Sequence, residues 1–214
     1  MHSDDEQLNT LKEWWSKNGK PLVAGVVIAV AGVGGWKGWE QHQISQAVSA
    51  SDLYIELTQV VAQGVGESRD QQAQALIDRL TQEHAASVYA DYARLFAARL
   101  AVERDALEEA EGHLQAALSA TRIEAIELVA RLRLARILHS QEQLDEALAI
   151  LDVQDSAGFT TEFQSLRGDL LMAKGDTFAA REAYERALEA SRMIGESAPL
   201  VEIKLDSLAH QGEA

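Results

Sequence analysis

Hydrophobic and polar residues divide the chain into two regions with different patterns. Residues 21–36 form one apolar, glycine-containing run without a charge, whereas from about residue 41 onward apolar residues recur at i, i+3 and i+4. The first pattern is typical of a helix surrounded by lipid or by protein core, and the second is typical of amphipathic helices. Because the second region has a single proline, Pro199, and no stretch of period two, we predict an all-α protein.

The apolar run is flanked by all the tryptophans of the chain. At about 1.5 Å per residue, residues 21–36 span roughly 24 Å, and continuing to Trp39 brings the helix close to the ~30 Å of a bilayer core. Indole rings and lysines favour the two interfaces of a membrane. We therefore predict a transmembrane helix over residues 21–39 in the lipid bilayer, with interface anchors at Trp14, Trp15, Lys17, Lys20, Trp36, Lys37 and Trp39.

Two other interpretations of this run stay open. A buried helix of a soluble domain has a similar length, but it would gain nothing from Trp and Lys at both ends, and glycines would weaken it. A cleaved signal peptide would need a small-x-small site close behind the run, where Lys37 and Glu40 stand instead. An uncleaved anchor fits the residues better than either.

The lysines also predict an orientation. Three of them precede the run and Lys37 alone follows it closely, so the positive-inside rule places the N-terminus in the cytoplasm and the rest of the chain on the outer face. In a bacterium with two membranes this describes a single-pass inner-membrane protein. The predicted parts are a cytoplasmic amphipathic segment (1–20), the transmembrane helix (21–39) and a periplasmic domain (40–214).

Small residues suggest two further features of this region. Asn18 and Gly19 predict a break between the amphipathic segment and the span, because Pro21 suits the first turn of a new helix. Small side chains spaced along one face of a membrane helix allow a second helix to approach closely. The candidate helix-packing residues are Gly25, Ala29 and Gly32 on one stripe of the helix and Gly35 on another.

The helical region repeats itself. Segments 96–118, 134–151 and 167–188 share a small residue, a polar turn, an alanine and a large or small apolar residue in the same order. The alanines after the turns, at 110, 147 and 180, bracket a period of about 34 residues, which is that of tetratricopeptide repeats. Stacked hairpins bury a core that one hairpin cannot bury alone. We predict a tetratricopeptide-like α-solenoid of helical hairpins, with a generic helical bundle as the alternative.

Composition and charge exclude several functions. The net charge is −15, and because the charges of residues 1–20 sum to −1 and those of 21–40 to zero, −14 falls on residues 41–214. Such a surface repels phosphate backbones, so we predict no nucleic-acid partner. The chain has no cysteine, and its six histidines lack metal-ligand spacing. We therefore predict no catalytic residue, metal site, cofactor or small-molecule substrate, and a protein that is not an enzyme.

A binding function is more concrete. The first helices of stacked hairpins line the concave surface of a solenoid. Arg133 and Arg136 stand out there on an acidic domain as anchors for a partner carboxylate. The alternative is that they are solvated or paired with nearby glutamates. The candidate partner-binding residues are Arg99, Arg133, Arg136, His139 and Asp169.

The stretch "DDEQLNTLKEWWSKNGKPLVAGVVIAVAGVGGWKGW", with its WW-x-x-N-G motif at residues 14–19, resembles the YfgM-type ancillary subunits of the bacterial Sec translocon. The resemblance extends over nearly the whole chain. It implies a single-span inner-membrane protein that binds SecYEG and a PpiD-like periplasmic chaperone and assists newly exported proteins. A membrane-anchored scaffold or negative regulator of an envelope-stress signalling pathway is the alternative that it also implies.

Overall fold

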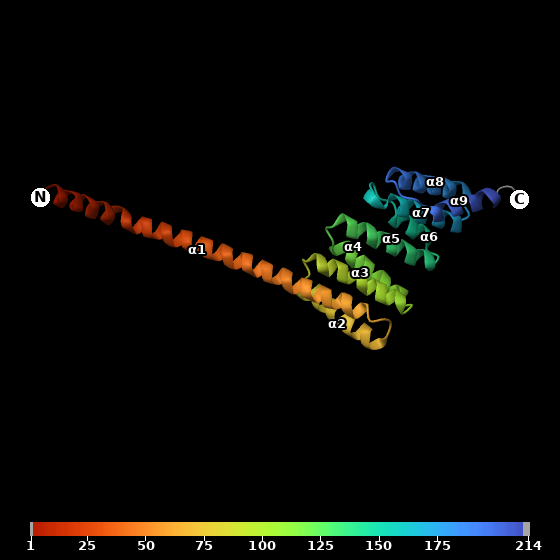
Figure 1. Cartoon of the computed structure of the whole chain (residues 1–214), viewed down its shortest axis with the longest axis horizontal. Coiled ribbons are helices and arrows are strands. Elements are labelled where there is room, and N and C mark those ends of the chain that lie inside the picture. The colour runs from red at the N-terminus through yellow and green to blue at the C-terminus, as the bar shows by residue number, and fades with distance from the viewer. Residues whose placement is uncertain (1, 212–214) are drawn as a thin grey trace. The chain divides into compact units, whose positions relative to one another are not determined.

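The computed structural model describes residues 2–211, with the side chains of 8–156 and 158–208. Within these residues the chain forms α-helices and one short 3-10 helix and no strand, which confirms the all-α prediction. Figure 1 labels the helices along the chain. They are α1 (His2–Val61), α2 (Glu67–Glu83), α3 (Val88–Glu103), α4 (Leu107–Ala120), α5 (Glu124–Ser140), α6 (Leu144–Ile150), η1 (Ala157–Phe159), α7 (Thr160–Ala173), α8 (Thr177–Met193) and α9 (Pro199–Gln211).

The chain divides into two compact units, Met1–Ser51 and Asp52–Ala214. The first unit is the greater part of helix α1. The second contains the last turns of α1 and the helices α2 to α9. The expected boundary at residues 39 and 40 follows from the end of the apolar run and not from the end of a helix, and it stays a prediction.

Helix α1 is continuous, so the predicted break at Asn18 and Gly19 is wrong. Pro21 lies inside the helix. The Asn18 side chain donates its Nδ2 hydrogen to the carbonyl oxygen of Trp14 at 3.1 Å, four residues back. The Trp15 ring covers Gly19, where a Cβ would lie 3.1 Å from Cε2 of the indole. The helix therefore continues through Asn18, Gly19 and Pro21, the residues that favoured its end in the sequence.

One stretch of α1 is long and apolar enough to cross a membrane. An 18-residue window within Leu8–Val61 has a mean hydropathy of 1.5, and none of that window is buried inside the structure. A core helix of a soluble domain would be mostly buried, so that interpretation of the run does not fit.

The predicted hairpins are present. Helix α3 packs against α4, α5 against α6, and α7 against α8, and these three pairs correspond to the three sequence repeats. Short junctions at 104–106, 141–143 and 174–176 join the two helices of each pair, where the repeats have their polar turns. The sequence reading missed two junctions, at 84–87 and 121–123. The first had a signal, since Ser87 caps α3 by accepting from the backbone N–H of Ala90 at 3.2 Å.

The repeated small and apolar positions form the core. A continuous cluster runs from α3 to α7, and a second one joins α8 to α9. Helix α9 covers the last hairpin through buried Val201 and Leu208. The buried repeat positions are Ala98, Ala110, Leu114, Ala117, Ala135, Leu138, Ala147, Leu151, Gly168, Ala180, Tyr184 and Ala187.

Candidate functional site

The predicted interface anchors lie along α1. The four tryptophans and the three lysines Lys17, Lys20 and Lys37 are exposed on the helix surface. Trp36 and Trp39 lie together, with ring centroids 5.5 Å apart. An exposed pair of indoles suits a headgroup layer, where the ring is apolar and the N–H meets water. The depth that these residues set in a bilayer stays a prediction.

The small residues of α1 leave an open surface. A Cβ built at Gly25, Gly32 or Gly35 would meet no heavy atom within 4 Å, and Ala29 is exposed. No neighbouring atom of the described residues covers these positions, and the pairing of helices there stays a prediction.

The three candidate arginines come together on the first helices of two successive hairpins. Arg99 lies on α3, and Arg133 and Arg136 lie on α5. Arg99 and Arg133 both line two adjoining pockets. Tyr54, Tyr92, Phe96 and Phe159 line the first, which we call the aromatic pocket. Val102, Leu107, Ile137 and Arg136 line the second, which we call the aliphatic pocket.

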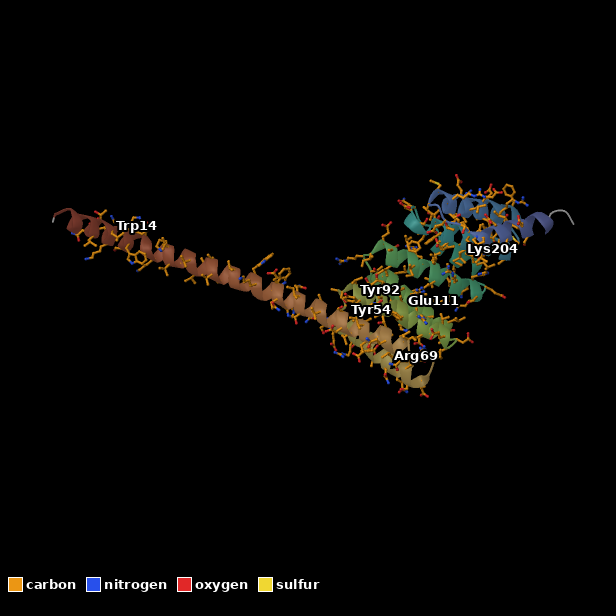
Figure 2. The ribbon with its side chains drawn as sticks, in the orientation of Figure 1. Trp14, Tyr54, Arg69, Tyr92, Glu111 and Lys204 are labelled. Atoms are coloured by element: carbon orange, nitrogen blue, oxygen red, sulfur yellow. The ribbon has the colours of Figure 1, made fainter. Side chains whose placement is uncertain are left out.

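Ring contacts build the aromatic pocket. The Tyr54 ring centroid lies 5.6 Å from that of Tyr92 and 6.1 Å from that of Phe96, and Figure 2 labels the two tyrosines beside each other. Tyr54 belongs to the last turns of α1 and the other two to α3. Burial, followed by the nearby hydroxyls of Tyr92 and Tyr89, raises the pKa of Tyr54. The Tyr54 phenol is therefore neutral at ordinary pH and presents its ring to the pocket.

Arg133 is the central residue of the arginine group. Its Nη1 donates to the carbonyl oxygen of Leu95 at 3.3 Å, which ties α5 to α3 and fixes the guanidinium between the pockets. Partial removal from water, followed by repulsion from Arg136 and Arg99, lowers the pKa of Arg133. An arginine stays protonated in spite of such a shift, so the positive charges repel one another.

The arginines differ in their pairing. Arg99 forms an ion pair with Glu103, with Nε 2.8 Å from Oε1, and its role in partner binding stays a prediction. Glu103 also accepts from the buried Arg69 of α2 at 2.9 Å. Among the described side chains, Arg133 and Arg136 form no ion pair with a carboxylate, and both are exposed. These two keep charge available for a partner.

The remaining two candidates, Asp169 and His139, do not line the aromatic pocket or the aliphatic pocket. Asp169 on α7 is half-buried and accepts from the Tyr184 hydroxyl at 2.8 Å, and it binds Lys204 of α9 at 2.7 Å. His139 is half-buried in the last turn of α5. Asp169 thus has internal partners on α8 and α9, and its role in binding stays a prediction, as does that of His139.

The aromatic residues of the groove were missed in the sequence. Their signal was present: Tyr92 and Phe96 stand four residues apart, which places them on one face of a helix. Tyr54 and Phe159 come from distant segments and have no local signal. Among the described side chains, no group of three or more histidines and acids is placed to hold a metal ion.

Stacked helical hairpins with small residues at their crossings, and a groove along the first helices, define a tetratricopeptide repeat-like protein. The profile of the tetratricopeptide repeat-like domain family matches residues 12–210. Together with full-length relatives, this match places the chain in the family of ancillary SecYEG translocon subunits.

These relatives carry that name and align from end to end. The protein of Haemophilus influenzae is 32% identical over 206 residues, which cover 96% of this chain and 97% of the relative. The protein of Escherichia coli K12 is 30% identical over 97% of both chains. The protein of Neisseria gonorrhoeae is 29% identical over 96% of this chain and 97% of its own. No solved structure matches the chain.

Proposed function

We propose that the chain is anchored in the inner membrane by α1, binds the SecYEG channel, and presents its repeat domain in the periplasm to a PpiD-like chaperone. The names of the relatives support the association with the channel. The lysine distribution around the apolar run supports the orientation. Helix α1 supports the anchor, because it is apolar and its apolar window is exposed.

One observation carries the chaperone-binding role. Arg133 and Arg136 hold exposed positive charge on α5, the first helix of its hairpin, in a domain whose net charge is strongly negative. Unpaired guanidinium groups beside aromatic rings are typical of residues that dominate protein interfaces. Bidentate pairing with a carboxylate would satisfy them.

Purification of the full chain in mild detergent tests this function. We expect SecYEG and the chaperone to co-purify with the chain as it stands. In the double variant Arg133→Glu and Arg136→Glu, we expect the chaperone to be lost and the channel to remain, because α1 is unchanged. Circular dichroism checks folding.

A matched control is available on α8. Arg181 and Arg192 are exposed, and among the described residues neither forms an ion pair. Reversing both to Glu changes the net charge equally and should leave both partners bound. Chaperone binding that survives reversal of Arg133 and Arg136 would remove them from the site. Recovery of a stress regulator in place of the channel and chaperone would favour the signalling function instead.

A further inference from the structure

We propose that the groove formed by the two pockets binds an extended acidic segment of its partner that carries an aromatic side chain on one side of its carboxylates and an aliphatic side chain on the other. This inference rests on the proposed function and names the chemistry that the surface recognises. Its three elements are the aromatic pocket, the arginines Arg133 and Arg136, and the aliphatic pocket.

The order of these elements follows from the residues that the pockets share. Arg99 and Arg133 line both pockets, so these two residues lie where the pockets adjoin, and Arg136 lines the aliphatic pocket beside them. The aromatic rings lie on one side of them, and Val102, Leu107 and Ile137 on the other. A ligand that fills both pockets must therefore pass the arginines. Along its length, the ligand must therefore carry first an aromatic side chain, then acidic side chains and then an aliphatic side chain.

Unpaired charge argues for carboxylates in the middle of the ligand. Arg133 uses one of its five donors on the carbonyl oxygen of Leu95, and the others remain free for a carboxylate. A ligand carboxylate would also relieve the mutual repulsion of Arg133, Arg136 and Arg99. Uncharged unfolded chains would leave these guanidinium groups desolvated without a partner, which is unfavourable.

Exposure argues for apolar side chains at the two ends. Tyr92 is 38% exposed and Val102 is 46% exposed, although both belong to α3, a helix with many buried residues. Large apolar groups left in water beside fixed charges are typical of binding surfaces. The Tyr92 ring also contacts the Tyr54 ring. Because this contact already restricts the Tyr92 side chain, stacking of a ligand ring on it costs little further side-chain entropy.

Acids within the groove fix where the ligand carboxylates lie. Glu103 and Asp105 both line the aliphatic pocket. Glu103 is neutralised by Arg99 and Arg69, whereas Asp105 has no ion pair among the described side chains. Asp105 repels a carboxylate placed at its end of the pocket. The ligand acids should therefore bind near Arg133 and Arg136, with an uncharged side chain toward Asp105.

Peptide binding to the full chain in detergent tests the proposal. The probes are fluorescein-labelled peptides with blocked ends that carry Phe and Leu separated by two, three or four residues, two of which are Glu. Anisotropy measures the dissociation constant. We expect one spacing to bind, and exchange of both Glu for Gln to weaken it about tenfold or more, as loss of charge-assisted hydrogen bonds requires.

Variants of the chain locate the bound peptide. Arg133→Glu with Arg136→Glu should abolish binding, and Tyr92→Ala and Val102→Ser should each weaken it. Matched controls on α8 and α9 should leave the dissociation constant unchanged: Arg181→Glu with Arg192→Glu, Phe178→Ala and Leu200→Ser, all exposed positions outside the groove. Binding that is insensitive to Glu-to-Gln exchange, or equal loss in the controls, overturns the proposal.

Failure of this inference differs from failure of the proposed function. If none of the three peptides binds while the chaperone still co-purifies and is lost on reversal of Arg133 and Arg136, the function stands and the recognition of an acidic extended segment is wrong. If an unfolded neutral polypeptide binds as tightly as the acidic peptide, the groove is a general client site, and the inference is also wrong.

Discussion

Tyr184 lies directly on Gly168, so closely that a Cβ at position 168 would be 2.4 Å from its Cε1 atom. Gly168 belongs to α7 and Tyr184 to α8, and this contact closes the last hairpin of the solenoid. Both residues are buried. This pair explains why the repeat has a small residue on its first helix. Because Gly168 has no side chain, the large side chain of the second helix has room to pack at the helix crossing.

Gly168→Ala should therefore destabilise the domain. Alanine is worth about 1 kcal/mol more than glycine within a helix, but the added methyl group overlaps a buried ring, and overpacking costs about 1–3 kcal/mol. We expect a net decrease in the melting temperature of the full chain, measured by circular dichroism in detergent. Gly112→Ala is the matched control, because its Cβ would meet nothing within 4 Å. That variant should be as stable as the parent or more so, and a stable Gly168→Ala protein would contradict the packing argument.

The same tyrosine predicts a loss of stability at high pH. Burial, followed by the hydrogen bond to Asp169 and the charge of that carboxylate, raises the pKa of Tyr184 above its ordinary value of 10.0. The neutral phenol is therefore favoured in the folded state. The stabilisation by this phenol is fully present below the pKa that Tyr184 has in the unfolded state. It is lost as the pH rises from that value through the higher pKa of the folded state.

Tyr184→Phe tests this contribution. The variant loses a hydrogen bond to a carboxylate, worth about 1.5–3 kcal/mol, although Asp169 keeps Lys204 as a partner. We expect the stability difference between parent and variant to shrink as the pH is raised above about 10. Melting temperatures of both proteins at several alkaline pH values measure it. A difference that does not change with pH would contradict the role of the phenol.

The ionised Glu103 carboxylate should contribute to the stability of the fold, and this contribution should be lost at acidic pH. Its burial alone would raise the pKa, but the hydrogen bonds from Arg99 and Arg69 outweigh that effect, and the pKa of Glu103 lies below its ordinary value of 4.5. Stability from this carboxylate is present above the unfolded value and is lost as pH falls through the folded one. Glu103→Gln should lower the melting temperature at neutral pH and should reduce the further loss on acidification. Arg69→Met should reproduce part of the effect, since Arg99 still pairs with Glu103.

The sequence predicted the fold best at the positions where the repeat period selects residues that pack at helix crossings. Ala110, Ala147 and Ala180 were recognised by their spacing, and all three are fully buried at helix crossings. The break expected at Asn18 and Gly19 was wrong, since α1 is continuous there, and the Trp15 ring covers Gly19. Such a contact depends on a rotamer, which a pattern of residue types does not contain.

In the candidate site, too, some residues could be predicted from the sequence and others could not. The arginines were visible in the sequence as basic residues on an acidic chain, and the structure brings Arg99, Arg133 and Arg136 together. The aromatic pocket was not visible, because Tyr54 and Phe159 are far from Tyr92 in sequence and meet it only through the stacking of helices. Asp169 could not be recognised as an internal partner, since Tyr184 and Lys204 lie on two later helices.

The proposed orientation in the membrane has a direct test, because the chain has no cysteine. Ser3→Cys and Ala116→Cys each introduce one thiol, the first before the apolar run and the second at an exposed position of α4. In intact cells whose outer membrane is permeabilised, a membrane-impermeant maleimide should label position 116 and leave position 3 unlabelled until the inner membrane is disrupted. Equal labelling of both before disruption would show that α1 does not cross, and labelling of position 3 alone would reverse the orientation. Lys17→Glu with Lys20→Glu should increase labelling of position 3, because these changes remove two of the charges that hold the N-terminus inside.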